Sequence, residues 1–386
     1  MARTGVNVLR RQREKEETYV DYSLIFIILF LLAFGLVMIY STSTYWANLK
    51  AGGDLSYYFR HQFGAVLGGI VAMLFMSYFP YGFLRKMAFP LYATSVGLLI
   101  LTPFIGREIN GAKRWIQIPG LGLSIQPAEI AKIAVIVFMA TMILRLQKLL
   151  LTPKGFGVAL GFPAFLAMLI RLCTKNLSSA IIVMGIAIVM LFIATPGYKR
   201  YVMAALSVLA FGALLVFIIS HAGANGSFRS ERVLAWLDPQ GHATGKGFQT
   251  LQSLYAIGSG GTFGKGLGES MQKMGFIPEA QNDMIFSVIC EELGLFGAIA
   301  VMLMFLLLIW RLMIIANNAP DMFGALLVIG VMAHIAIQVI LNIAVVTNTI
   351  PNTGITLPFI SYGGTAVTFQ LAELGIALNV GRNIGR

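Results

Sequence analysis

The stretch DMIFSVICEELGLFGAIAVMLMFLLLI, residues 283–309, decides the class of fold. Its apolar run is long enough to cross a lipid bilayer, which takes about 20 mostly apolar residues in a helix. The run nevertheless starts beside Asp283 and contains Glu291 and Glu292. A charged side chain at the centre of a membrane helix costs roughly 2.5–3.5 kcal/mol on insertion scales. The stretch therefore predicts a transmembrane helix whose acidic side chains face protein or a water-filled cavity.

The rest of the chain has the composition of a multi-pass membrane protein. Of its 386 residues, 58% are hydrophobic and 11% are charged, whereas a soluble domain has about 25% charged residues. We predict an all-α fold with about ten transmembrane helices in a single domain, residues 1–386. The apolar stretches lie near residues 23–40, 64–79, 87–104, 129–146, 155–172, 177–195, 201–220, 284–309, 325–346 and 363–380.

The basic residues predict the orientation of these helices. An even number of spans puts both termini on one side, and Lys and Arg favour cytoplasmic loops. The basic residues of the N-terminal segment and of alternate loops share one side if both termini are cytoplasmic. We expect residues 1–21 to be a cytoplasmic tail and not a removed signal peptide. Residues 221–282 are expected to form a large extracytoplasmic loop between the seventh and eighth spans, with short helices on the membrane and flexible glycine-rich turns.

Several other classes of site are not expected. A phosphate-binding loop needs Ser or Thr after its lysine, but glycine follows both Lys246 and Lys265. Nucleotide binding is rejected on that ground, and no nucleic acid is expected as a partner. Cys173 and Cys290 are far apart and the four histidines are scattered, so neither a disulfide framework nor a zinc site is expected. Each histidine is expected to be a satisfied polar side chain.

Basic residues also gather on the predicted outer side, where membrane orientation does not require them. A long outer segment is translocated regardless of its charge, which accounts for Arg232. The short outer loop that holds Arg107, Lys113 and Arg114 has no such explanation. Anionic lipid head groups and phosphates are the partners available there. We therefore predict an anion-binding site at the outer face.

Polar side chains at the outer ends of two spans each allow two interpretations. The dipeptide Gln126-Pro127 predicts a helix start. Glu129 and Lys132 then share one helical face, either as an ion pair or as a grip on a phosphate or sugar. Asp283 either caps its helix or takes part in chemistry.

The segment TNTIPNTGITLPFISYGGTA, residues 347–366, separates the last two spans. It is polar, rich in glycine and broken by proline. Irregular backbone at membrane depth is tolerated only against protein or water. We therefore predict a re-entrant or cleft-lining element, and a cleft is a place for a ligand.

Five sequence blocks resemble the SEDS family (shape, elongation, division and sporulation), in the family's order. They are NGAKRWI, QPAEIAKI, LQSLYAIGSGG, GFIPEAQNDMIFSVICEELG and NTGITLPFISYGG. The resemblance covers nearly all the spans. It implies a ten-span protein of the bacterial inner membrane that polymerises lipid II into the glycan strands of peptidoglycan. It also implies a partner, a class B penicillin-binding protein, whose transmembrane helix we expect against the eighth or ninth span.

The resemblance implies roles for individual residues. Asp283 matches the family's catalytic aspartate, which faces an outer cavity. Glu129 and Lys132 match the polar pair of the fourth span that lines the same cavity. The shared outer motifs contain further residues expected to bind substrate, namely Gln252, Ser253, Glu279 and Ser361, together with Pro278 and Gly363. Two positions depart from the family. Asn176 stands where many members have Asp, which puts a catalytic role there in doubt, and Ala128 replaces a common serine.

The implied chemistry suits these residue types. A sugar hydroxyl is a poor nucleophile, so a carboxylate that takes its proton during attack assists the reaction, and Asp283 is the candidate. A departing lipid pyrophosphate needs positive charge beside it. The candidate cations are Lys113, Arg114, Lys132 and Arg232. No cofactor is expected, with a divalent cation as the alternative source of charge. Glu291 and Glu292 are expected to be packed or paired inside the protein.

Two other functions stay open on the sequence alone. A flippase that moves lipid II across the membrane would need polar residues through the whole depth of the spans, whereas the polar blocks here gather on the outer side. A non-enzymatic scaffold that recruits the penicillin-binding protein would leave the carboxylate and lysine groups without a purpose. The sequence does not separate roles in elongation, division and sporulation.

Overall fold

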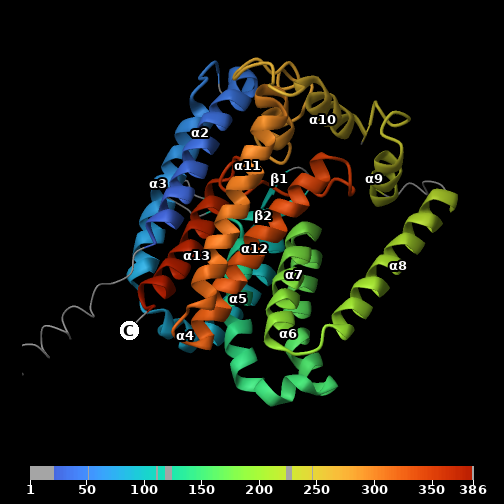
Figure 1. The fold of residues 1–386 in the computed structure, drawn as a ribbon. Helices are drawn as coiled ribbons and strands as arrows, with labels where there is room; N and C mark the ends of the chain where they lie inside the picture. The colour runs from blue at the N-terminus through green and yellow to red at the C-terminus, as the bar shows by residue number, and fades with distance from the viewer. Residues whose placement is uncertain are drawn as a thin grey trace, which may run out of the picture.

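The computed structural model describes residues 21–50, 52–109, 112–117, 124–222, 228–245 and 247–384, which form a bundle of long helices (Figure 1). Eight of the described helices are long and apolar enough to cross a membrane. They are α2 (Tyr22–Lys50), α3 (Tyr57–Tyr78), α4 (Tyr81–Ile105), α5 (Pro127–Leu146, continued by the 3-10 helix η1, Gln147–Leu151), α6 (Pro153–Cys173), α7 (Leu177–Ala194), α11 (Ile285–Asn317) and α12 (Met322–Val346). The predicted all-α, multi-pass class is therefore confirmed.

Two further helices occupy the remaining predicted stretches. Helix α8 (Lys199–Ala222) leans away from the bundle, whereas α13 (Gly364–Arg382) lies within it and packs against α3 (Figure 1). Helix α13 contains several polar side chains and buries Gln370, Glu373 and Asn379 inside the bundle. The number of membrane crossings and the side on which the termini lie stay predictions.

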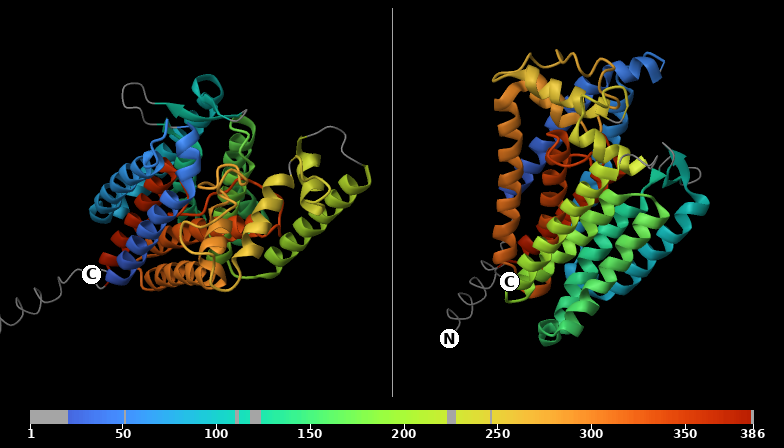
Figure 2. Two further views of the ribbon diagram at one scale, coloured as in Figure 1. Left: turned by 90° about the horizontal axis from the view of Figure 1, so that it is seen from above. Right: turned by 90° about the vertical axis from the view of Figure 1, so that its right-hand side faces the viewer.

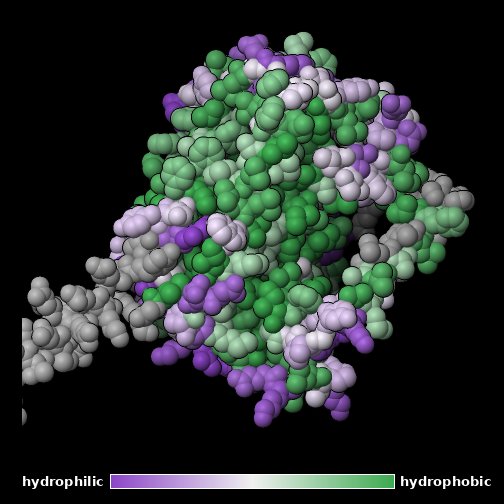
Figure 3. Space-filling view, viewed as in Figure 1, coloured by the Kyte–Doolittle hydropathy of each residue, from purple (hydrophilic) through white to green (hydrophobic). Residues whose placement is uncertain are grey.

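The core of the bundle surrounds α12, which packs against α5, α7, α11 and α13. Leu327 and Ile335 of this helix have exposed fractions of 0%. Helices α3 and α13 approach closely because both use glycine; a Cβ on Gly375 would lie 2.4 Å from the carbonyl oxygen of Met73. Apolar side chains cover much of the visible side of the bundle, and hydrophilic ones gather mainly toward its ends (Figure 3). This distribution suits a lipid environment.

The helix start predicted at Gln126-Pro127 is confirmed, because α5 begins at Pro127 with Gln126 extended before it. The preceding residues form a small antiparallel sheet, an element that the all-α prediction lacked. Its strands are β1 (Arg107–Ile109), β2 (Ala112–Gln117) and β3 (Ser124–Ile125), in the order β1-β2-β3. Neighbouring residues of a strand point to opposite faces. The sheet therefore separates side chains that are adjacent in the short basic loop.

The predicted outer segment contains two short helices, α9 (Phe228–Leu237) and α10 (Gly247–Gly260), followed by the irregular residues 261–284. Helix α10 and the irregular segment lie over one end of the bundle (Figure 2). The short helices agree with the prediction. Helices α9 and α10 and the start of α11 lie toward the same end of the bundle as the small sheet (Figure 1).

The glycine-rich part of this segment packs against a break in α11. The break is at Gly294, whose φ of 67° is not helical. The carbonyl of Glu292 loses its helical partner there and accepts a hydrogen bond from Gly266 N at 3.0 Å. A Cβ on Gly264 would lie 2.1 Å from the same carbonyl oxygen, so only glycine fits. Gly264 therefore permits close packing against α11, and the flexibility of these turns stays a prediction.

Candidate active site

Asp283 lies just before α11, where three other elements converge. Its side chain is partly buried. Gln249 of α10 donates a hydrogen bond to Asp283 Oδ1 at 3.4 Å, and Asn342 of α12 donates to the Asp283 carbonyl at 2.8 Å. The loop before α13 also passes nearby, since a Cβ on Gly354 would lie 3.8 Å from Asp283 Oδ2. Asn342 therefore holds the backbone, whereas the side-chain hydrogen bond from Gln249 is long, so the carboxylate keeps the capacity to accept a hydrogen bond from a ligand.

The capping interpretation of Asp283 is wrong. Met284 occupies the cap position of α11, and no side chain forms a cap hydrogen bond there. The first helical residue is Ile285, so Asp283 lies one residue too early to serve as the cap. Its carboxylate turns instead toward α10 and the loop before α13. Local helix chemistry therefore does not account for an acidic residue at this position.

The surroundings of Asp283 make its carboxyl group unusually basic. The pKa of Asp283 is raised to about 6, mainly by burial and to a smaller extent by the negative charge of Glu279. The hydrogen bond from the backbone of Asp283 itself, the positive charge of Arg232 and the hydrogen bond from Gln249 all lower the pKa. A carboxyl group with a pKa near 6 is mostly ionised at neutral pH yet accepts a proton far more readily than an ordinary aspartate. This is the property that a general base requires.

Two arginines bring positive charge to the same region. Arg232 of α9 donates to the Asn352 carbonyl at 3.2 Å, and Arg114 of β2 donates to the Thr174 carbonyl at 3.3 Å. Burial lowers the pKa of both guanidinium groups, and the charge of Arg232 lowers that of Arg114 further. The two cations therefore lie close enough to repel each other, an arrangement that favours an anion between or beside them.

A cavity of about 220 Å³ opens beside this group. Its lining includes Arg232, Trp236, Phe248, Gln249, Pro278 and Asn352. Gln249 is shared between the cavity and Asp283, because its amide nitrogen donates to the carboxylate while its oxygen accepts from Asn352 at 3.2 Å. The cavity thus connects an arginine to the candidate base through one bridging glutamine.

Lys113 does not join the site, although it is adjacent to Arg114 in the sequence. The two residues alternate along β2 and face opposite sides of the strand. Lys113 Nζ donates to the Pro103 carbonyl at 3.1 Å, at the end of α4. The structure therefore separates the two cations that the short basic loop had suggested as a pair.

Glu129 and Lys132 form the predicted ion pair on α5. The Lys132 Nζ to Glu129 Oε2 distance is 2.8 Å, and the two side chains are only 2% and 6% exposed. Among the described residues, no hydrogen bond or ion pair links either of them to Asp283. The ion-pair interpretation is confirmed, and contact of this pair with substrate stays a prediction.

The other predicted substrate-binding residues shape the site from within. Ser253 is buried and donates to the Val346 carbonyl at 3.1 Å. Ser361 is buried and donates to the Asn282 carbonyl at 2.7 Å. The Ser253 hydroxyl thereby joins α10 to the end of α12, and the Ser361 hydroxyl fastens the loop before α13, residues 347–363, to the segment before α11. Direct contact of these serines with substrate stays a prediction.

The remaining motif residues border Asp283 less tightly. Glu279 adopts a left-handed conformation with φ of 51°, which is uncommon for a residue with a side chain and occurs often at functional sites. Its carboxylate accepts from Asn282 Nδ2 at 2.8 Å. Gln252 is half-buried on α10, and Gly363 N donates to Gln62 at 3.1 Å. Glu279 is the member of this group that acts on Asp283, through its charge.

Comparison with known proteins assigns the family. Residues 22–384 match the model of the FtsW, RodA and SpoVE family, described as a cell cycle protein. The chain belongs to this family. It is 40% identical to stage V sporulation protein E of Bacillus subtilis (strain 168), over 95% of the chain and 98% of that protein. It is 38% identical to a probable peptidoglycan glycosyltransferase FtsW of Trichlorobacter lovleyi, over 93% and 92%. The resemblance inferred from the motifs is confirmed.

Solved structures share the same fold. One is a chain of a peptidoglycan synthase complex that coordinates polymerization and crosslinking, with a TM-score of 0.73 and 29% identity over 95% of this chain and 98% of that chain. Another is the rod shape determining protein RodA of Thermus thermophilus, with a TM-score of 0.66 and 26% identity over the same shares. The FtsW, RodA and SpoVE fold is therefore common to all three chains.

The residue that departs from many family members has a structural role here. Asn176 lies directly before α7 and accepts a hydrogen bond from Ser179 N at 3.1 Å. This is an N-cap, which asparagine and aspartate perform about equally well. Ala128, the other departure, is fully buried in α5. Neither position contributes a charge to the Asp283 region.

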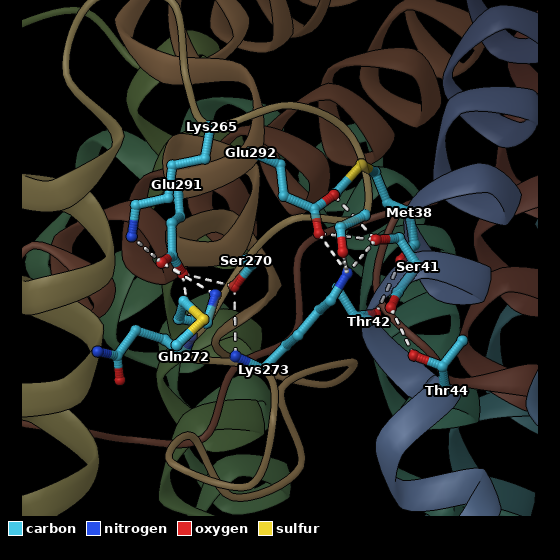
Figure 4. Close-up of polar contacts among 12 residues, drawn as sticks. Met38, Ser41, Thr42, Thr44, Lys265, Ser270, Gln272, Lys273, Glu291 and Glu292 are labelled. Atoms are coloured by element: carbon cyan, nitrogen blue, oxygen red, sulfur yellow. Dashed lines mark hydrogen bonds and ion pairs between the residues drawn. The ribbon is translucent and has the colours of Figure 1, made fainter.

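Glu291 and Glu292 are paired, as predicted (Figure 4). Glu292 is 2.7 Å from Lys273 Nζ and accepts from the Ser41 hydroxyl of α2 at 2.7 Å. Glu291 is 2.7 Å from Lys265 Nζ and also accepts hydrogen bonds from Ser270 and from two backbone N–H groups. Both carboxylates are 0% exposed. Together they hold residues 261–275 against α2 and the upper part of α11.

The sequence motifs did not single out the amides that contact Asp283. Gln249 lies three residues before the predicted Gln252, and this spacing on a helix was the available signal. Asn342 gave no comparable local signal, because it lies within the apolar run of α12. No group of three or more His, Cys, Asp or Glu residues in the described part of the chain could hold a metal ion. The structure therefore names no protein ligands for a divalent cation.

Proposed function

We propose that this member of the FtsW, RodA and SpoVE family is a peptidoglycan glycosyltransferase that polymerises lipid II at the outer face of the bacterial inner membrane. The observation that carries the proposal is Asp283, a partly buried carboxylate whose pKa is raised to about 6 and which lies near Arg232. The probable activity in the names of its FtsW relatives supports the same conclusion. A partly buried base beside cations suits a sugar transfer with a phosphate leaving group.

Asp283 acts as the general base in this mechanism. The 4-hydroxyl oxygen of a GlcNAc attacks the anomeric carbon of a MurNAc while its proton passes to the Asp283 carboxylate. The bond between that carbon and the pyrophosphate oxygen breaks, and the electron pair leaves with the lipid pyrophosphate. Each cycle extends the glycan strand by one glycosidic bond and leaves a protonated Asp283, which returns its proton to solvent.

Arg232 and Arg114 stabilise the leaving group. A guanidinium presents several N–H donors in one plane and matches two phosphate oxygens at once. Their mutual repulsion is relieved when the pyrophosphate binds, so affinity for the anion increases. Lys132 is already neutralised by Glu129, which makes it a poorer candidate than the arginines.

The partner in this proposal is a class B penicillin-binding protein that crosslinks the new strands. A solved chain of the same fold belongs to a synthase complex of polymerization and crosslinking, which supports the proposal. Of the two helices expected to receive its transmembrane segment, α12 is largely enclosed by the bundle, whereas α11 leaves Leu303, Leu306 and Trp310 exposed. The exposed face of α11 is therefore the proposed contact.

Reconstitution tests the function directly. The purified chain, together with its cognate penicillin-binding protein, is supplied with labelled lipid II, and the products are separated by length. Glycan strands that are absent when the penicillin-binding protein is tested alone support the proposal. A complex that moves lipid II across vesicles without making strands would indicate a flippase, and one that does neither would indicate a scaffold. Either result would overturn the enzymatic assignment.

A further inference from the structure

A buried polar network joins α12 to α13, and the mechanism above does not use it. His334 and Gln338 lie on α12, and Gln370 and Glu373 lie on α13; their exposed fractions are between 1% and 3%. His334 Nδ1 is 2.6 Å from Glu373 Oε2, and its Nε2 is 3.0 Å from the Gln338 side-chain oxygen. Ionisable side chains among membrane helices are costly, and they mark functional positions more often than simple packing contacts.

The partners of Gln338 determine where its protons lie. The Thr356 carbonyl can only accept a hydrogen bond, so the amide nitrogen of Gln338 faces it at 3.0 Å. The amide oxygen of Gln338 must then face His334 and Gln370, at 3.0 and 3.3 Å. His334 Nε2 therefore carries a proton, and a further proton is shared between Nδ1 and Glu373. The orientation of the Gln338 amide is thus set from both sides.

Gln338 reaches the candidate active site through the loop before α13. The residue before Thr356 is Ile355, whose carbonyl accepts from Asn342 Nδ2 at 2.7 Å. The same Asn342 nitrogen donates to the Asp283 carbonyl at 2.8 Å. Gly354, the next residue along the loop, lies beside the Asp283 carboxylate. Gln338 and Asn342, one helical turn apart on α12, therefore hold Thr356 and Ile355, the two loop residues that directly follow Gly354.

We propose that His334, Gln338 and Glu373 are positioning residues for Asp283. The proton shared by His334 and Glu373 orients His334, which orients the amide of Gln338. That amide holds the Thr356 carbonyl. The position of Thr356 in turn fixes the preceding loop residues, so that Gly354 stays beside the Asp283 carboxylate. The inference rests on the proposed function, because it concerns the geometry of the base. It adds that the base depends on a network deep in the bundle that touches neither substrate nor the reacting atoms.

The main test replaces Gln338 by methionine, which has a similar length but lacks the amide that forms the hydrogen bonds to His334 and Thr356. The variant complex is assayed with lipid II for kcat, KM and their pH dependence. We expect kcat to fall about tenfold or more, because a small misplacement of a catalytic group has effects of this size, while KM changes by less than about twofold. The lower pH limb of kcat should move below about 6, since a displaced loop admits water to Asp283.

A conservative pair of variants supplies the rescue test. Glu373→Gln keeps the shape and can donate to a neutral His334 Nδ1, so we expect kcat within about threefold of wild type. Glu373→Leu removes the hydrogen bond and should lose kcat as Gln338→Met does. Asn379→Leu is the matched control, because Asn379 joins α13 to the Ser77 carbonyl at 2.7 Å, away from this loop. It should lower the melting temperature and leave the kcat of the folded protein unchanged.

The outcomes separate this inference from the proposed function. If the wild-type complex makes no glycan strands, the proposed function fails. If it makes them and Gln338→Met keeps both the kcat and the pH limb, only the positioning role fails. If the Gln338→Met protein does not fold, the comparison of Glu373→Gln with Glu373→Leu tests the positioning role. Equal kcat values for Glu373→Gln and Glu373→Leu would then overturn the inference, and recovery by glutamine alone would support it.

Discussion

Asp283 and the pair Glu291–Glu292 lie close together at the start of α11, yet their charges are balanced in opposite ways. Each glutamate has a lysine at 2.7 Å and further hydrogen bonds. Asp283 accepts a long hydrogen bond from Gln249 at 3.4 Å besides one from its own backbone, and Arg232 acts on it through its charge. Satisfied carboxylates hold the fold together, whereas one left incompletely satisfied beside a cavity is available for chemistry.

Substitution of Asp283 should have the largest effect on activity. Asp283→Asn keeps the size of the side chain but cannot accept a proton, so polymerisation should fall about 100-fold or more. Lipid II binding should be retained. Folding should not suffer, because a pKa raised from 3.8 to about 6 means that burial disfavours the ionised form. The melting temperature above pH 6 should therefore equal or exceed that of wild type. Near-normal glycan synthesis by Asp283→Asn would refute the assignment of the base.

Loss of Lys273 should have the largest effect on stability. Lys273→Met leaves Glu292 buried without its cation, and breaking one side of a buried pair costs about 3–5 kcal/mol. Lys265→Met is the matched comparison. The Lys265 side chain is 35% exposed and Glu291 keeps its other donors, so the cost should be about 1 kcal/mol or less. Thermal unfolding of both variants gives the comparison. Equal losses would show that the two pairs contribute alike, and the double variant Lys273→Met/Glu292→Gln should recover much of the loss.

The pH dependence of activity should report Asp283. The base works only when ionised, so kcat/KM should fall about tenfold per pH unit below the pKa, which lies at about 6. Above that pH the activity should level off until other groups titrate. The residual activity of Asp283→Asn should lack this limb. A wild-type profile that is flat from pH 5 to 7 would contradict the raised pKa.

Two adjacent cations offer the smallest and most selective test. Arg114→Gln should weaken lipid II binding about tenfold, because a charge-assisted hydrogen bond contributes about 1.5–3 kcal/mol. Lys113→Gln should change binding by less than about twofold, since its side chain points to the other face of β2. Binding is measured with labelled lipid II on the intact complex. A larger effect from Lys113 than from Arg114 would reverse the proposed placement of the anion.

Much of the candidate site was predictable because its main residue lies in a recognisable block. The block around Asp283 resembles the SEDS family, and Arg114 lies in a short outer loop whose positive charge membrane orientation does not explain, whereas Arg232 lies in a long outer segment that is translocated regardless of its charge. For Lys113, Ser253 and Ser361, the sequence predicted contact with substrate, whereas the structure shows each side chain bonded to a backbone carbonyl. Motif membership does not tell whether a side chain faces the cavity or fastens a neighbouring backbone, as Ser253 and Ser361 do.

The sequence by itself determined the features that depend on local chemistry. The apolar runs established a multi-pass helical membrane protein, Pro127 marked the start of α5, and the three-residue spacing of Glu129 and Lys132 predicted their ion pair. Helix starts and side-chain neighbours within one turn follow from backbone geometry that is the same in every protein. Such features need no knowledge of the rest of the chain.

Only the tertiary structure decided which distant groups meet. Ser41 reaches Glu292 across 251 positions of sequence, Gln249 and Asn342 converge on Asp283 from different helices, and His334 proves to be paired with Glu373. A buried carboxylate must find a donor, but the sequence does not say which one, because the choice depends on how the helices pack. The difference between the surroundings of Asp283 and those of Glu291 and Glu292 arises from those long-range contacts.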